Sequence, residues 1–321
     1  MQAELLVEVT RGGEVESVHH GHIAVVNAAG ELVDGRGAPG LPVYPRSAAK
    51  MIQALPLVRS GAAAARHLGS EQLALSCASH NGALIHTKPV ARWLAALELG
   101  EADLRCGPQM PDDRPAREGL IKTDESPCQF HNNCSGKHAG FLTLNSHLGG
   151  GPEYHEVDHP VQQAALAAWE DICDEATAGY GIDGCSAPNF RSSVTAMARA
   201  MAKFAVAAEG SAEQQLRDAM RAHPELVAGE GRACTEMMRA AKGKAAVKTG
   251  AEGYFTAILP EQGLGIALKV ADGTTRAAEC AMAALLVKYG VLDRNDPAVI
   301  KRWGPMTNRR NIEVGEVRPA F

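Results

Sequence analysis

The chain has few aromatic residues, no long apolar run and no cluster of basic residues. Aromatic side chains make up only 4% of its 321 residues, so aliphatic side chains must build the core, as in closely packed, Ala-rich helices. No segment approaches the length of a membrane span, and Glu4 stands where a signal peptide needs basic residues. The sequence therefore predicts a cytoplasmic protein with no membrane partner.

Charge and cysteine spacing exclude further classes of protein. The formal net charge is -5 and there is no basic run, so the sequence lacks the electrostatic footprint of a nucleic-acid-binding protein. The eight cysteines show no CxxC spacing, and in a reducing compartment we expect thiols rather than a disulfide framework. A small molecule is the expected partner.

Strand-like patterns occur at both ends of the chain and helix-like patterns lie between them. Alternation in the first 35 residues predicts a strand meander, and strands return at 245–247, 254–259 and 265–270 before a last helix over 274–289. Helices are predicted at about 88–99, 136–147, 160–178, 191–209, 212–222 and 232–242. We expect an α/β (α+β) fold in one domain. An antiparallel sheet from about 1–46 and 244–321, covered by helices, accompanies a central helical lobe from about 47–243.

Three short motifs occur in a meaningful order: Ser47-x-x-Lys50, Ser79-His80-Asn81 and Lys248-Thr249-Gly250. On the first turn of a helix the side chains of Ser47 and Lys50 share a face, so a neutral amine can take the hydroxyl proton. A second lysine nearby, Lys248, would help to keep that amine neutral. Each motif alone is common. In this order they match the SxxK, SxN and KTG set of serine β-lactamases and penicillin-binding proteins.

The other motif residues have roles that follow from their chemistry. Ser79 can relay a proton to the leaving nitrogen, and Asn81 can form hydrogen bonds with the substrate. Gly250 is expected to let the substrate approach its strand closely.

Five segments resemble the rhizobial-type (class 3) L-asparaginases, and the similarity spans nearly the whole chain. They are Pro45–Lys50, Ser79–Gly82, Asn132–His138, Gly181–Pro188 and Lys248–Gly250. The resemblance implies a serine β-lactamase-like fold, a homodimer, and hydrolysis of L-asparagine to L-aspartate and ammonia. It also implies two Ser/Lys pairs, Ser47 with Lys50 and Ser79 with Lys248. A seryl acyl-enzyme on Ser47 is expected, although the reverse allocation, with Ser79 as nucleophile, stays open.

The same resemblance implies a zinc ion near the catalytic serines, held by Cys134, Lys137 and Cys185. Zinc prefers thiolate, imidazole and carboxylate ligands, and an amine must first lose its proton. Chemistry alone would therefore favour His138 over Lys137, and without the resemblance the two cysteines would be interpreted as buried core thiols. We expect the zinc to position the substrate rather than to generate hydroxide.

Four residues are candidates for substrate binding: Arg46, Asn81, His138 and Asp183. Asp183 can bind the substrate amino group or orient a metal-bound water, and Arg46 can pair with a carboxylate. A turn cap and a surface charge are the alternatives for these two. Two other functions remain open at this point: a β-lactamase-like serine esterase or peptidase, and a non-catalytic zinc-bound ligand sensor.

Overall fold

The computed structural model describes residues 2–321, and they form two compact units. The sheet unit comprises the described residues up to Ala49 together with Ser192–Val206 and Glu236–Phe321, and the helical unit comprises Lys50–Arg191 and Ala207–Thr235. Helix α12 (Ala233–Ala240) includes the second passage of the chain from the helical unit to the sheet unit. Among residues 2–321, no helix combines the length and apolar character that a membrane crossing requires.

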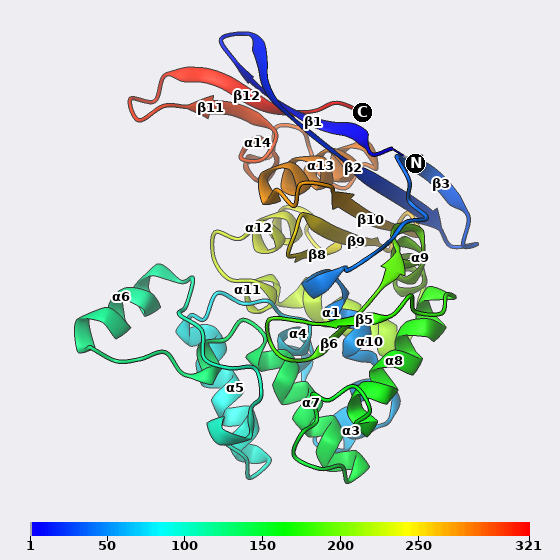
Figure 1. The fold of residues 1–321 in the computed structure, drawn as a ribbon, viewed down its shortest axis with the longest axis vertical. Coiled ribbons are helices and arrows are strands. Elements are labelled where there is room, and N and C mark those ends of the chain that lie inside the picture. The colour runs from blue at the N-terminus through cyan, green and yellow to red at the C-terminus, as the bar shows by residue number, and fades with distance from the viewer. Residues whose placement is uncertain (1) are drawn as a thin grey trace. The chain divides into compact units, whose positions relative to one another are not determined.

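Both ends of the chain contribute to the main sheet. Its strands follow the order β11-β12-β1-β2-β10-β9-β8, with β3 also paired to β2. All of these pairings are antiparallel. Figure 1 shows the first strands, in blue, beside the last, in red. The bounds are β1 (Glu4–Arg11), β2 (Glu14–Asn27), β3 (Leu32–Arg36), β8 (Ala246–Gly250), β9 (Tyr254–Leu259), β10 (Leu264–Val270), β11 (Gly304–Thr307) and β12 (Glu313–Pro319). The predicted sheet from both termini is confirmed.

Helices cover both faces of the central strands. Every residue of β9 is buried, and neighbouring side chains of a strand point to opposite faces, so neither face is open to water. Helices α9 (Val194–Ala205) and α13 (Thr275–Lys288) pack on β9 and β10. Gly265 of β10 allows the close approach of α9, because a Cβ atom there would lie 2.1 Å from the Ala198 carbonyl oxygen. This contact places Ser192–Val206 in the sheet unit, although the sequence predicts the segment in the helical lobe.

The rest of the sheet unit consists of short elements. They are β4 (Pro42–Val43), which pairs with β7 (Ser192–Ser193), the 3₁₀ turn η1 (Arg46–Ala49), and α14 (Pro297–Ile300).

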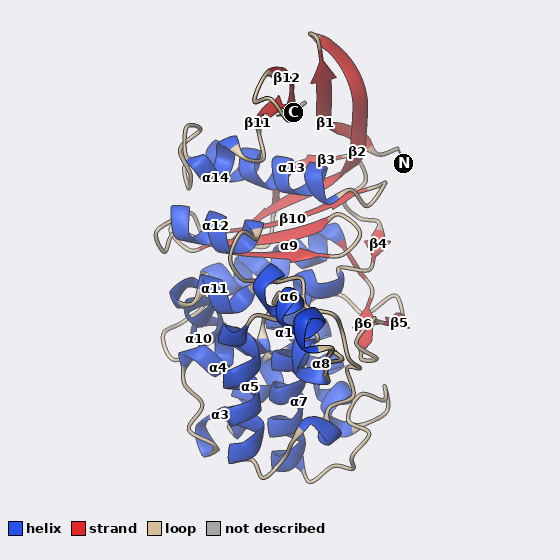
Figure 2. Cartoon of the chain, turned by 90° about the vertical axis from the view of Figure 1, so that its left-hand side faces the viewer, coloured by secondary structure: helices blue, strands red, loops and turns tan. Residues whose placement is uncertain are grey.

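The helical unit is built around α7 (Ser135–Leu148), in which every residue from Ser135 to Leu144 is buried. A helix that is buried all round belongs in the centre of a unit, so the side chains of Lys137 and His138 lie in the interior. Figure 2 distinguishes these helices, in blue, from the strands in red. The other bounds are α1 (Lys50–Gln53), α2 (Leu55–Arg59), α3 (Ala62–Ala65), α4 (Ser70–Ser76), α5 (Leu84–Ala96), η2 (Glu101–Asp103), α6 (Arg114–Thr123), η3 (Gln129–His131), α8 (Pro160–Cys173), β5 (Tyr180–Ile182), β6 (Pro188–Phe190), α10 (Ala212–Ala222) and α11 (Pro224–Val227).

Candidate active site

In the sheet unit, the turn that carries Ser47 packs against the strand that carries Lys248. Turn η1 contacts β8 and β9, and the Thr256 hydroxyl donates a hydrogen bond to the Ala48 carbonyl oxygen at 3.0 Å. Arg46, directly before Ser47, has a φ of +52°. This left-handed backbone conformation is rare for residues other than glycine and often occurs at functional sites. Ser47 therefore lies on a tight turn that packs against β8, the strand that carries the buried Lys248.

Gly250 is the reason that this turn can approach β8 so closely. A Cβ atom at Gly250 would lie 2.4 Å from the Pro45 carbonyl oxygen and 3.0 Å from the Ala48 nitrogen. The room beside Gly250 was expected to admit substrate. In the structure the protein's own η1 segment fills that room, because the main chain before Ser47 lies directly on the strand.

In the helical unit, Lys50 lies beside the segment that carries Ser79. The Lys50 side chain is buried, and its Nζ donates to the Ala78 carbonyl oxygen at 2.5 Å and to the Cys134 sulfur at 3.0 Å. The Ser79 amide donates to the Val227 carbonyl oxygen at 2.9 Å. Lys50 is thus fixed next to Ser79 by a main-chain contact, and a thiol is its second partner.

The three predicted zinc ligands lie together in the helical unit. Cys134, Lys137 and Cys185 are 4%, 2% and 2% exposed. Lys137 Nζ donates to the Cys185 sulfur at 3.1 Å, and the Cys134 and Cys185 thiols shift each other's pKa. Cys134 comes from the residue before α7, and Cys185 from the turn between β5 and β6.

Mutual contacts divide the protons of this cluster unequally. The interaction with Cys134 lowers the pKa of the Cys185 thiol well below its usual value, and the Lys137 charge lowers it further against the effect of burial. The same interaction, together with burial, raises the pKa of Cys134. Burial opposes the charge on Lys137, yet Cys185 and Cys134 raise its pKa overall. The cluster therefore favours one thiolate, one thiol and one ammonium group.

The donor set of this cluster fits a zinc ion. Two thiols supply the soft ligands that zinc prefers. His138 lies beside them and acts on the Cys185 thiol, and its Nδ1 lies 2.8 Å from the Tyr154 hydroxyl. In the part of the chain that the structure describes, no three His, Cys, Asp or Glu side chains are grouped to hold a metal. A zinc site here would therefore need Lys137 as its third ligand.

A second buried cluster lies directly beside Ser79. The imidazoles of His80 and His86 stack with ring centroids 4.7 Å apart. Burial lowers the pKa of both, and the neighbouring charges of His86 and Lys50 lower that of His80 further. His80 Nε2 lies 2.9 Å from the Ser135 hydroxyl, whose own proton goes to the Phe130 carbonyl oxygen. His80 therefore donates from Nε2 and is neutral.

The other predicted site residues have different surroundings. Asn81 is buried and its amide bonds to Ala83 and Asp113. Asp183 accepts a hydrogen bond from the Gly184 amide at 2.8 Å, and its charge acts on Lys137. Asp183 thus belongs to the thiol cluster, whereas Arg46 belongs to the sheet unit.

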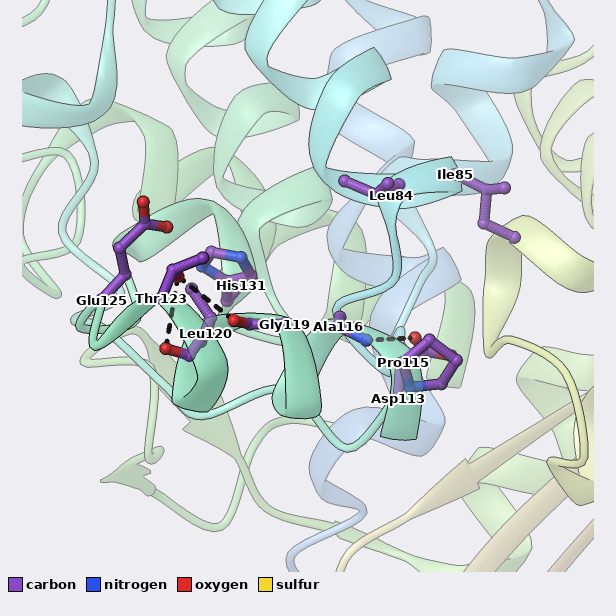
Figure 3. Close-up of a pocket in the computed structure, with 10 residues that line it drawn as sticks. All are labelled: Leu84, Ile85, Asp113, Pro115, Ala116, Gly119, Leu120, Thr123, Glu125 and His131. Carbon is purple, nitrogen blue, oxygen red and sulfur yellow. Dashed lines mark hydrogen bonds between the residues drawn. The ribbon is translucent and has the colours of Figure 1, made fainter.

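A hollow of about 550 Å³ lies on the helical unit between α6 and the start of α5. Figure 3 shows the residues that line it, and none of them is among the catalytic, substrate-binding or metal-binding residues that the sequence predicts. Leu84 and Ile85 are its large exposed hydrophobic residues, and Asp113 caps α6 at its edge.

Comparison with known families identifies the chain. The family model for L-asparaginase II matches residues 7–319. The chain belongs to the L-asparaginase II family. This membership confirms the resemblance to asparaginases. It also implies that the substrate of the chain is a small molecule.

Other comparisons add less. A β-lactamase from Mycobacterium bovis is 14% identical, with a TM-score of 0.46, and the match covers 84% of this chain and 94% of that one. A protein from Bacteroides dorei described as a β-lactamase is 14% identical, with a TM-score of 0.46 and coverage of 84% and 92%. The comparison with curated proteins gives no match.

Sequence reasoning missed several residues around the site. Asn133 accepts a hydrogen bond from the Cys134 thiol at 2.9 Å, and Asp113 bonds to Asn81. Asn133 lies within Asn132–His138, one of the segments that resemble the asparaginases, so the sequence could have indicated it. Asp113 had only a helix-start signal, an Asp followed by Arg114-Pro115.

Proposed function

We propose that the protein hydrolyses L-asparagine to L-aspartate and ammonia through a seryl ester. The observation that carries this proposal is the match of residues 7–319 to the L-asparaginase II family. The packing of η1, with Ser47, on the strand of Lys248, and the contact of Lys50 with Ala78, next to Ser79, support it.

The proposed chemistry needs only the two Ser/Lys pairs. Ser47 Oγ attacks the side-chain amide carbon of asparagine while Lys50 takes the hydroxyl proton. The C–N bond breaks, and the leaving nitrogen takes a proton through Ser79 and Lys248 to depart as ammonia. Water then attacks the β-aspartyl ester and gives a proton to Lys248 through Ser79, while Lys50 returns its proton to Ser47 Oγ as aspartate leaves.

One contact favours the opposite allocation of the two serines. Lys50 Nζ bonds to the carbonyl oxygen of Ala78, the residue directly before Ser79, so Lys50 is a candidate base for Ser79 as well. The overall reaction is the same in both cases. The two allocations differ in which serine becomes esterified.

Zinc at Cys134, Lys137 and Cys185 is part of this proposal. When bound, it would supply a fixed positive charge that orients the substrate, with Asp183 and His138 beside it. Arg46 is proposed to pair with the substrate carboxylate. A homodimer and a cytoplasmic location complete the proposal.

The test is ammonia release from L-asparagine by the wild type, Ser47→Ala and Ser79→Ala, with glutamine and nitrocefin assayed in parallel. Turnover lost in Ser47→Ala, with a β-aspartyl ester trapped on Ser47 and detected by mass spectrometry, is the expected result. An ester on Ser79 would reverse the allocation. Wild-type turnover of nitrocefin without turnover of asparagine would replace the asparaginase with the esterase.

A further inference from the structure

The side-chain amide of Asn81 is engaged by the protein itself. Asn81 is 5% exposed. Its Oδ1 accepts a hydrogen bond from the Ala83 amide at 3.3 Å, and its Nδ2 donates to Asp113 Oδ1 at 3.4 Å. Gly229 lies directly on the amide, since a Cβ atom there would be 2.4 Å from Asn81 Cγ. Both ends and one face of the Asn81 side chain are therefore occupied.

Asp113 uses both of its carboxylate oxygens at this point. Oδ1 accepts from Asn81, and Oδ2 accepts from the Ala116 amide at 3.0 Å, which caps the start of α6 (Figure 3). The Asp113 amide also donates to the Asn81 carbonyl oxygen at 2.8 Å. An asparagine at this position would offer only one acceptor and would turn an N–H toward Asn81. Two acceptors at this side-chain length are a property of aspartate.

This pair is the third support of the Ser79-His80-Asn81 segment. Val227 accepts from the Ser79 amide and Asn133 accepts from the His80 amide, so each residue of the segment bonds to a different neighbour. The third neighbour, Asp113, opens a helix that packs little. Only Leu120 is buried among the 10 residues of α6, and isolated helices shorter than about 12–15 residues are marginal in water.

We propose that Asn81 and Asp113 form a positioning pair that fixes the Ser79 segment, in place of a substrate-binding role for Asn81. The proposal rests on the proposed function in one respect, that Ser79 takes part in catalysis. Asn81 and Asp113 affect catalysis only by holding Ser79 in position. The order of α6 and the order of the Ser79 segment are therefore coupled through one carboxylate.

A reciprocal exchange of the two side chains tests the pair. Asp113→Asn sets two amide N–H groups against each other, and Asn81→Asp sets two carboxylates against each other. In the double variant Asn81→Asp/Asp113→Asn, the amide introduced at position 113 donates to the carboxylate introduced at position 81. The acceptors for the Ala83 and Ala116 amides are both retained. All three side-chain hydrogen bonds are then restored.

The assay has one arm with substrate and one without. For each single variant we expect kcat to fall by about tenfold or more with little change in KM, since small displacements of catalytic groups are costly. Amide hydrogen exchange of residues 79–83 should become faster in the same proteins. The double variant should recover most of both properties. Asp113→Ser, which keeps the helix cap without the second acceptor, should resemble Asp113→Asn.

Asp112→Asn is the matched control, because Asp112 is an adjacent exposed carboxylate that pairs with Arg117 at 3.4 Å. It should behave as the wild type. A double variant with restored amide exchange but a raised KM would assign Asn81 to the substrate and overturn the proposal, as would single variants with unchanged kcat and exchange. If the wild type releases no ammonia from asparagine, the proposed function fails, whereas the exchange arm still decides whether the pair holds the segment.

Discussion

Replacing Gly250 by alanine should displace the turn that carries Ser47. The new Cβ atom would lie 2.4 Å from the Pro45 carbonyl oxygen, whereas ordinary contact begins at 3.4 Å, so the main chain before Ser47 must move by about 1 Å. The obstructing atoms belong to backbone, which cannot rotate away as a flexible side chain can. Overpacking of this kind costs about 1–3 kcal/mol of unfolding free energy.

The effect on activity should exceed the effect on stability. A displacement of about 1 Å at a reacting group can cost about 100-fold in rate, so we expect kcat/KM for asparagine to fall by up to about that factor while the protein stays folded. Urea unfolding and ammonia release, measured on the same preparations, separate the two effects.

Gly40→Ala is the control for this prediction. Gly40 also lies in the sheet unit, and a Cβ atom there would meet nothing within 4 Å. It should leave both activity and stability unchanged. Full activity in Gly250→Ala, with an unchanged urea midpoint, would refute the argument that this glycine sets the position of Ser47.

Two further predictions concern protons. Because burial lowers the pKa of His80 and His86 below the ordinary histidine value of 6.5, their contribution to stability is fully present above pH 6.5 and is lost as pH falls toward the folded-state values, by at most about 1.4 kcal/mol per pH unit for each histidine. Urea unfolding between about pH 8 and pH 5 measures this slope, which should be shallower in His86→Phe; equal slopes in the two proteins would contradict it. Zinc should bind with net proton release and more weakly at lower pH, because Cys134 and Lys137 carry protons that ligands must lose. Calorimetry in buffers of different ionisation enthalpy measures the protons released, and binding with none would exclude Lys137 as a ligand.

The fold was largely predictable because long periodic segments dominate it. The alternation in β1 and β2 and the Ala-rich pattern of α13 predict elements that the structure contains. The β11–β12 hairpin was missed, since β12 has a single buried residue, Val317, and so no clear alternation. Helix α6 was missed for a similar reason, because its apolar residues are few and only Leu120 is buried.

The sequence selects candidate site residues but does not give the contacts between them. Motif spacing and family resemblance selected Lys50 and Cys134 separately, for a base and for a metal ligand. Their contact at 3.0 Å brings the start of α1 next to the residue before α7. These two segments lie far apart in the chain, so no local sequence pattern predicts the contact. The same limit applies to Asn81, whose neighbours Asp113 and Gly229 come from two distant segments.

These contacts link Lys50 to the proposed metal ligands. Lys50 donates to Cys134, the Cys134 and Cys185 thiols shift each other's pKa, and Lys137 donates to Cys185. A change in protonation at either thiol therefore alters what the neighbouring amine can donate to or accept from. Because Lys50 also bonds to the residue before Ser79, the thiol cluster and the Ser79 segment share one amine. Zinc binding at Cys134 would engage the sulfur atom that accepts the Lys50 hydrogen bond, so zinc occupancy and the position of the Lys50 side chain should vary together.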